Sequence, residues 1–193
     1  MKKTLTVLIC FFLTTINLFA QNQKKEELKP VLLVIDVQNN YLPMMDKSDK
    51  DKAFDYINAA IWLFEKYDLP IIRIYHQDIE RGPAEDSEAF KFAPEIKIKD
   101  EYPMVIKHYG NAFNQTNLDQ ILKDRDVNAL FICGLSATGC ALSTYVGAED
   151  CDYDVFMIEN ALLSPNAEHT DFIEEIKRSI NFDMLNFLFK CTQ

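Results

Sequence analysis

Short apolar runs alternate with amphipathic stretches from residue 30 onward. The runs cover residues 30–36, 70–75, 103–107, 128–134 and 154–158. Continuous apolar runs of this length, rich in β-branched residues, are typical of strands that are buried on both faces of a sheet. The pattern therefore predicts five strands.

The stretches between these runs carry apolar residues at helical spacing. In residues 51–67 they recur at intervals of three and four, which predicts a helix. Further helices are predicted from an N-cap at Thr116 through Leu122, over residues 139–150 and over residues 166–180. Strands that alternate with helices in this way indicate an α/β fold, namely a three-layer α/β/α sandwich with a mainly parallel sheet.

Two parts of the chain lack such a pattern. The polar stretch His76–Tyr102 predicts a surface loop over a site at the sheet edge, with or without a short helix. Beyond Asn181 the pattern fits both a helix and an edge strand. No repeat or linker follows Lys29, so residues 30–193 are expected to form one domain.

Residues 1–20 have the pattern of a signal peptide for export. Two lysines precede a largely apolar run without charge, and Ala20 precedes the polar segment 21–29. This order predicts cleavage near Ala20 and a periplasmic or secreted protein, with no membrane contact after cleavage. The alternative is a retained N-terminal anchor, because Leu18 is larger than the residue usually found at that place.

Acidic residues outnumber basic ones, 30 to 20, which gives a formal net charge of −10. Cleavage of the signal removes two lysines and no acidic residue, so the remaining chain is more acidic still. Such a surface repels phosphate backbones, and nucleic acid is therefore not expected as a partner. The hydrophobic content of 48% is that of an ordinary globular chain and permits a buried core.

Four cysteines follow the predicted signal: Cys133, Cys140, Cys151 and Cys191. An even number is compatible with disulfides in an oxidising compartment, and a Cys151–Cys191 bridge is one alternative. Free thiols are the other. Cys133 lies in an apolar run and Cys140 directly after a turn, which is a poor arrangement for a bridge.

Asp36, Lys107 and Cys140 lie at or just beyond the ends of three predicted strands. Ligands of parallel sheets bind where the carboxyl ends of the strands meet. Each residue alone has a simpler explanation, such as a loop cap, a lysine emerging into water or a cysteine of the core. Together they suit a nucleophilic site, in which Cys140 attacks and Asp36 serves as general base and then acid.

Cys140 is expected to begin a helix, near the positive end of its dipole, with Lys107 as a second positive charge. Both effects lower the pKa of a thiol and predict a reactive thiolate. The backbone amides of residues 135–140 are candidates for an oxyanion hole.

Three ordered segments resemble motifs of the isochorismatase-like cysteine hydrolases, a family that includes nicotinamidases, N-carbamoylsarcosine amidase and isochorismatase. Residues 31–41 resemble the opening strand with its Asp-x-Gln-x-Asp-Phe motif. Residues 105–118 resemble the lysine strand, the Ala-Phe turn and the Thr-x-Leu start of the next helix. Residues 130–140 resemble the Gly-x-x-Thr-x-x-Cys turn, although Thr138 falls one place late. The similarity extends over residues 30 to about 170.

This resemblance implies a Rossmann-like topology and a catalytic triad of Asp36, Lys107 and Cys140. It also implies a non-proline cis peptide between Leu135 and Ser136, with the amides of Ser136 and Cys140 as the oxyanion hole. No cofactor is expected.

No metal is expected either. The metal-binding nicotinamidases carry an Asp-x-His that is soon followed by another histidine. This chain has the reverse order, His76-Gln77-Asp78, and no further histidine until His108. His76 is instead a candidate for substrate contact or an ordinary loop histidine.

The candidates for the substrate pocket are Tyr41, His76, Tyr109, Phe113 and Tyr145. Asn40 and Tyr41 replace the Asp and Phe of the family motif, which predicts a different pocket floor. Tyr109, Phe113 and Tyr145 are placed to line an aromatic pocket for a flat substrate, and the alternative is that they belong to the core.

The predicted reaction is hydrolysis of a C–N bond in a small amide or carbamoyl compound, through a thioester on Cys140. One alternative is hydrolysis of a vinyl ether, as the resemblance to isochorismatase implies. Another is a secreted small-molecule-binding protein that kept the fold without turnover. The expected partner is a small-molecule substrate, and the family's tendency to oligomerise predicts a homo-oligomer.

Overall fold

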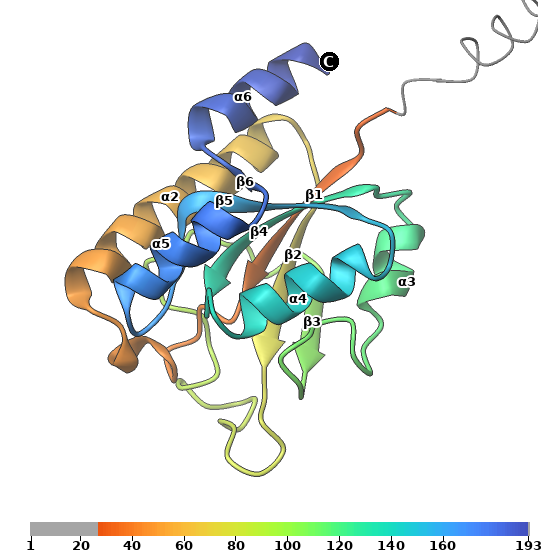
Figure 1. The fold of residues 1–193 in the computed structure, drawn as a ribbon. Helices are drawn as coiled ribbons and strands as arrows, with labels where there is room; N and C mark the ends of the chain where they lie inside the picture. Colours follow the sequence, from red (N-terminus) through yellow and green to blue (C-terminus); the bar gives the residue numbers. More distant parts are fainter. Residues whose placement is uncertain (1–26, 193) are drawn as a thin grey trace, which may run out of the picture.

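A parallel sheet of six strands forms the centre of the structure, a computed structural model that describes residues 27–192 (Figure 1). The strands are β1 (Pro30–Ile35), β2 (Ile71–His76), β3 (Met104–Lys107), β4 (Ala129–Leu135), β5 (Asp154–Leu163) and β6 (Ser179–Ile180). The predicted export signal and residues 21–26 of the polar segment lie outside the described residues.

The strands follow the order β3-β2-β1-β4-β5-β6, and every neighbouring pair is parallel. The chain starts in the middle of the sheet with β1, builds outward to β3, and then returns to the other side of β1 with β4. The direction of winding therefore reverses between β1 and β4, and in such sheets this is where ligands bind.

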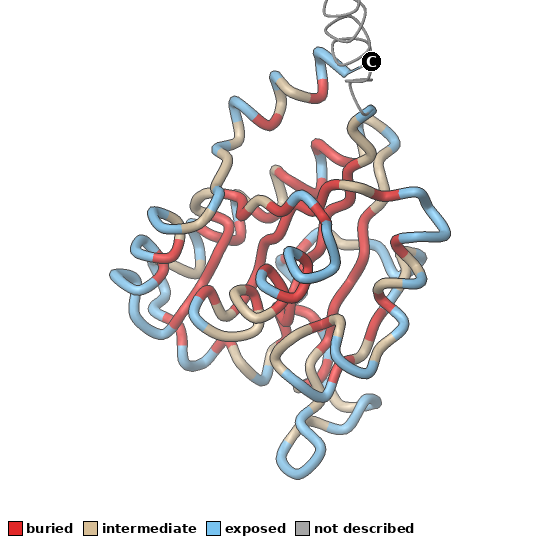
Figure 2. The backbone as a smooth tube through the Cα atoms, turned by 45° about the vertical axis from the view of Figure 1, so that its right-hand side comes forward, coloured by how far each residue is buried: buried red, intermediate tan, exposed pale blue. Residues whose placement is uncertain are grey.

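Helices cover both faces of the sheet. The helical elements are η1 (Leu42–Met44, a single 3-10 turn), α2 (Lys47–Lys66), α3 (Leu118–Lys123), α4 (Cys140–Glu149), α5 (Ala167–Ile176) and α6 (Phe182–Cys191). Side chains alternate across β1: Leu32 and Val34 pack with α2 and α6, whereas Val31 and Leu33 pack with α3 and α4. Figure 2 shows the buried residues concentrated in the strands between these layers. The predicted three-layer α/β/α fold is confirmed.

Two helix starts differ from the sequence prediction. Helix α2 begins at Lys47 rather than at residue 51, because the side chain of Asp46 accepts a hydrogen bond from Ser48 N at 2.8 Å and caps the helix earlier. Helix α3 begins at Leu118, and its N-cap residue is Asn117 rather than Thr116. The hydroxyl of Thr116 nevertheless accepts the hydrogen bond of Leu118 N at 3.1 Å.

The last third of the domain differs more. Strand β5 continues to Leu163, five residues beyond the predicted end. The helix predicted over residues 166–180 ends at Ile176 as α5, and a short strand, β6, follows it at the sheet edge. The undecided segment beyond Asn181 is helix α6, which the Asn181 side chain caps by accepting from Met184 N.

The long connection between β2 and β3 contains no helix and is only partly a surface loop. Phe92 forms an antiparallel bridge with Gln38, and Ala93 N donates to Val37 O at 2.9 Å. The rings of Phe90 and Phe92 stack on Tyr75 at 4.9 and 4.3 Å. The connection is thus anchored to the chain that follows β1, beside the carboxyl ends of the strands.

All four cysteines of the described chain are free thiols, so the Cys151–Cys191 bridge is absent from the structure. Cys133 is buried, Cys140 is half-buried, and Cys151 and Cys191 are exposed. Within residues 27–192, no helix combines the length and the apolar character that crossing a bilayer requires.

Candidate active site

The ends of four adjacent strands bring the candidate polar residues together. Asp36 directly follows β1, His76 and Lys107 are the last residues of β2 and β3, and Cys140 opens α4 after the turn that leaves β4. His76 and Lys107 lie opposite each other in the register of β2 and β3. Because the strands are parallel, these ends meet at one edge of the sheet.

Lys107 and Asp36 form a buried ion pair. The Lys107 Nζ atom lies 2.7 Å from Asp36 Oδ2, and the two side chains are 0% and 3% exposed. A buried charge is tolerated when it is paired and hydrogen-bonded, and each residue here supplies the partner that the other needs. Two of the three residues predicted for the triad are therefore in direct contact.

Lys107 also holds the ring of His76. Its Nζ atom lies 3.0 Å from His76 Nδ1. An ammonium group can only donate, so Nδ1 is the acceptor and the proton of the neutral ring is on Nε2. The pKa of His76 is lowered to about 4, first by burial and then by the charge of Lys107, while Asp78 and the backbone of Tyr109 act in the opposite direction. The ring is therefore neutral at pH 7.

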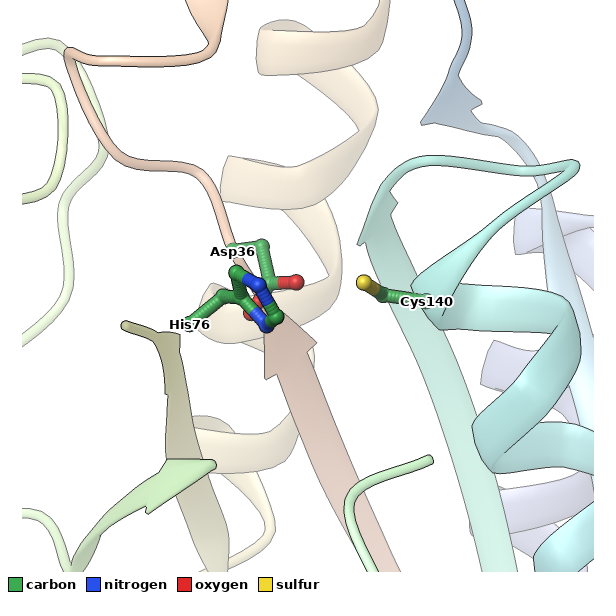
Figure 3. A group of neighbouring side chains, drawn as sticks. All are labelled: Asp36, His76 and Cys140. Atoms are coloured by element: carbon green, nitrogen blue, oxygen red, sulfur yellow. The ribbon is translucent and has the colours of Figure 1, made fainter. Parts of the chain in front are cut away.

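Cys140 completes the group. Figure 3 shows its sulfur pointing toward Asp36 and His76. A carboxylate oxygen of Asp36, a ring nitrogen of His76 and Cys140 Sγ all lie within 4.8 Å of one another. The second carboxylate oxygen of Asp36, Oδ1, is buried and has no hydrogen-bond partner within the described part of the chain. A buried acceptor left open in this way is suited to receive a proton from the thiol.

The ionisation of Cys140 differs from the sequence prediction. Burial, followed by the nearby charge of Asp36, raises the pKa of the Cys140 thiol to about 11, and Lys107 offsets this only in part. The resting group is thus a neutral thiol rather than a thiolate. The expected lowering fails because burial of the thiol and the neighbouring charge of Asp36 outweigh the effect of Lys107 on the sulfur.

The pKa of Asp36 is raised to about 6. Burial is the largest cause, and the charge and hydrogen bond of Lys107 and the Cys140 thiol counteract it. Asp36 is therefore ionised at pH 7 yet basic enough to take up a proton, which is the balance that general acid–base catalysis requires.

The turn between β4 and α4 has the expected cis peptide between Leu135 and Ser136. Gly134, the last but one residue of β4, has φ of 109°, and a Cβ atom there would lie 2.1 Å from Ile35 O. Only glycine allows this close approach of β4 to the end of β1, next to Asp36. The geometry of the turn is thus tied to the strand that carries the carboxylate.

The turn also presents unpaired amides. Ala137 N donates to Leu163 O at 2.7 Å, and Ser136 O accepts from the amides of Gly139 and Ala141. Within residues 27–192, the amides of Ser136 and Cys140 donate to no other group. They are available to a ligand beside the sulfur, as an oxyanion hole requires.

A cavity of about 210 Å³ opens beside Cys140. Its polar lining consists of Asp36, His76, Ser136 and Cys140. Its apolar lining consists of Tyr41, Met44, Met45, Leu135 and Pro165.

Two of the five predicted pocket residues, Tyr41 and His76, line this cavity. The other three do not. Tyr145, on the buried side of α4, belongs to the core and accepts a hydrogen bond from Arg178 N, while Phe113 packs against Tyr153. Tyr109 is an exposed side chain, and only its backbone lies beside the ring of His76. Tyr145 lies in a helix, and Tyr109 and Phe113 lie in the connection after β3, so none of the three side chains lines the cavity.

Sequence reasoning gave no role to Met44, Met45 and Pro165, which form much of the cavity wall. Pro165 lies two residues beyond the end of the extended β5, so the rule that sites form at strand ends indicates it once β5 has its full length. Met44 and Met45 end a short 3-10 turn and carry no sequence signal of this kind.

The spacing of Asp36, His76 and Cys140 would allow a shared metal ion, but the hydrogen bonding does not favour one. Nδ1 of His76 accepts from Lys107, and Nε2 carries the proton, so neither nitrogen offers a lone pair while Lys107 is charged. A metal ion would also compete with the Lys107 ammonium for Asp36.

Comparisons with known proteins identify the family of this chain. The model of the isochorismatase domain matches residues 30–181. The secreted isochorismatase effector Isc1 of Verticillium dahliae is 23% identical over 150 residues, which cover 76% of this chain and 79% of that protein. YddQ of Bacillus subtilis, an isochorismatase family protein, is 24% identical over 147 residues, which cover 74% of this chain and 82% of that protein.

Solved structures show the same fold. An isochorismatase-like hydrolase from Alkaliphilus metalliredigens superimposes with a TM-score of 0.74 at 18% identity, covering 83% of this chain and 99% of that one. N-carbamoylsarcosine amidase from Thermoplasma acidophilum superimposes with a TM-score of 0.68 at 20% identity, covering 80% of this chain and 95% of that one.

Proposed function

Since this chain belongs to the isochorismatase family, we propose that it is a cysteine hydrolase that cleaves the C–N bond of a small amide. The observation that carries the proposal is the set of contacts around Asp36: its carboxylate binds Lys107 on one side and has a free oxygen beside the Cys140 thiol on the other.

In the first step, Cys140 Sγ attacks the amide carbonyl carbon while Asp36 takes the thiol proton. Because the thiol is a much weaker acid than the carboxyl group, proton transfer and C–S bond formation take place together. The amides of Ser136 and Cys140 donate to the oxygen as negative charge develops on it. Lys107 keeps Asp36 oriented and ionised between turnovers.

In the second step, Asp36 returns the proton to the nitrogen, the C–N bond breaks, and ammonia or an amine leaves an acyl thioester on Cys140. Water then attacks the thioester, with Asp36 accepting its proton and passing it to the sulfur. The products are a carboxylic acid and the regenerated thiol. No oxidant, reductant or metal ion enters this sequence.

The test is ammonia release by purified protein that begins at residue 21, across a panel of small primary amides. Cys140→Ala should abolish release, and Cys151→Ser should not, because Cys151 is an exposed thiol remote from the cavity. Hydroxylamine added during turnover should yield the hydroxamate of the acyl group, which identifies a thioester.

The two other functions considered predict different results. A vinyl ether hydrolase would be silent on all amides but would hydrolyse a vinyl ether, and Asp36→Asn would abolish that activity because the reaction begins with proton transfer to the vinyl carbon. A binding protein without turnover would release nothing from any substrate while still gaining thermal stability with a ligand.

We also propose that the protein is exported and loses residues 1–20. The N-terminal sequence pattern supports this, as does the description of one relative as a secreted effector. The intact mass of the protein from its native host tests it, since a retained segment would add the full mass of those residues. The homo-oligomer stays a prediction, which light scattering of the mature chain would test.

A further inference from the structure

The cavity beside Cys140 is lined by no cationic side chain among the described residues. Its ionisable lining groups are Asp36, Tyr41, His76 and Cys140, and of these only Asp36 is charged at pH 7. A ligand with a carboxylate on its acyl group would therefore place that charge in a cavity without a cationic side chain to pair with it. Leaving a charge unpaired in a partly buried site is strongly unfavourable.

Lys107 does not supply that partner. Its ammonium group is completely buried, and its hydrogen bonds go to Asp36 and His76. An anion that drew on Lys107 would have to break the ion pair that keeps Asp36 ionised. The charge of Lys107 is thus already paired with the carboxylate of Asp36.

Two arginines are also paired with carboxylates of the protein. Arg73 pairs with Asp100 at 2.7 Å, and Arg178 pairs with Asp154 at 2.8 Å. Closer to the cavity, the carboxylate of Asp78 acts on both Tyr41 and His76, and the charge of Arg81 acts on Asp78 in turn. An approaching anion also meets the net negative charge of the whole chain.

The remaining features of the cavity suit an uncharged amide. The free amides of Ser136 and Cys140 can donate to a carbonyl oxygen, and the open oxygen of Asp36 can accept from an amide N–H. On the other side, Met44, Met45 and Pro165 offer apolar surface to the rest of the molecule.

Resting on the proposed function, we propose that the substrate is an uncharged small amide with an apolar acyl group, and that amides bearing a carboxylate are excluded. Hydrolysis turns the neutral amide into a carboxylate beside the ionised Asp36, so repulsion between the two carboxylates favours release of the product.

Matched substrates test this selectivity directly. Pentanamide is compared with succinamic acid, benzamide with 4-carbamoylbenzoate, and N-propylurea with N-carbamoylglycine, by ammonia release at pH 7.5. We expect kcat/KM of the neutral member to be higher by about 100-fold, since an unpaired charge costs a few kilocalories per mole. Equal or greater turnover of the anionic members, lost in Cys140→Ala, overturns the inference while leaving the proposed function intact.

A second measurement needs no turnover. Iodoacetamide is neutral and iodoacetate is an anion, but both alkylate thiols. The alkylation rate with iodoacetamide divided by that with iodoacetate therefore measures how strongly each cysteine excludes an anion. We expect the ratio at Cys140 to exceed that at the exposed Cys191 by about 10-fold or more. Equal ratios at the two cysteines contradict anion exclusion even if no amide is hydrolysed.

Met44 provides the gain-of-function variant, since it lines the cavity and is 58% exposed. Met44→Lys places an ammonium group at the rim, and Met44→Gln is the uncharged control. The lysine variant should lower two ratios by about 10-fold: that of kcat/KM for the neutral and the anionic amide, and that of the iodoacetamide and iodoacetate rates at Cys140. The first should fall mainly through a lower KM for the anionic amides, and added salt should weaken both changes. If Met44→Gln lowers both ratios equally, charge is not what selects the substrate.

Discussion

Gln38 holds both backbone polar groups of His76. Its Oε1 atom accepts from His76 N at 2.8 Å, and its Nε2 atom donates to His76 O at 3.2 Å. Gln38 is completely buried, so this pair of hydrogen bonds has no competition from water. The chain after β1 thereby sets the position of the last residue of β2, and with it the ring that Lys107 contacts.

Replacing Gln38 by the similarly sized Met should displace His76 and weaken the protein. The amide of His76 loses its hydrogen bond to Gln38, at about 1–3 kcal/mol for a buried group, whereas its carbonyl keeps the longer hydrogen bond from Tyr41 Oη at 3.4 Å. We expect kcat to fall by about 100-fold with a smaller change in KM, because the catalytic geometry shifts while the apolar wall remains. Urea denaturation and steady-state kinetics measure both effects. Asn39→Ala, which removes an exposed hydrogen bond to Glu88 O, is the control and should be close to wild type.

The activity should depend on the ionisation of Asp36. The carboxylate form is the base, and the pKa of Asp36 is raised to about 6 by burial. The value of kcat/KM should therefore rise as the pH increases through about 6 and level off above 7. Asp36→Asn should lower kcat/KM by about 10²–10⁴-fold and remove the rise. A pH profile of wild type and variant measures this. Asp154→Asn, which loses an exposed ion pair with Arg178, should keep the wild-type profile.

The thiol of Cys140 should react slowly in the absence of substrate. Its pKa is raised to about 11, so the thiolate is scarce at pH 7 and increases tenfold with each pH unit up to that value. Peptide mass spectrometry after brief exposure to iodoacetamide at pH 7, 8 and 9 gives the rate at each cysteine. A Cys140 rate that is already constant between pH 7 and pH 9 would show a thiolate and refute the assignment of a neutral thiol.

Gly134→Ala should destabilise the domain strongly. A methyl group there meets Ile35 O at 2.1 Å, and the φ of 109° is unfavourable for any residue with a side chain. We expect a loss of about 3 kcal/mol or more in the free energy of unfolding. At Gly110 the nearest atom to an added Cβ is the hydroxyl oxygen of Ser143 at 3.2 Å, which can rotate away. Gly110→Ala should cost less than about 1 kcal/mol, and a similar loss in both variants would argue against a special role for the close approach at Gly134.

The central sheet could be predicted because its strands are continuous apolar runs, as in residues 30–35. Prediction failed where local pattern and tertiary contact disagree. Glu159 and Asn160 interrupt the apolar run of β5, yet the strand resumes its pairing with β4 at Leu162. Residues 166–180 keep helical spacing, but α5 ends at Ile176, and the hydroxyl of Ser179, the first residue of β6, donates to Glu174 O in the last turn of α5.

The candidate site shows the same division. Asp36, Lys107 and Cys140 follow from their places at strand ends, and the structure brings them together. The ionisation of Cys140 could not be predicted, because burial and the neighbouring charge of Asp36 arise only in the folded chain. The methionines of the wall were missed because a short turn without a periodic pattern places them.

The walls of the cavity and its reactive groups come from different kinds of structure. Asp36, Lys107 and Cys140 are attached to the rigid sheet, whereas Met44, Met45 and Pro165 belong to connections that tolerate substitution more readily. Substitution of a few loop residues can therefore change which substrates the cavity accepts while the reactive groups stay the same. For protein engineering, the exposed Met44 is the position of the short 3-10 turn to vary, because Leu42 and Met45 on either side of it are part of the buried core.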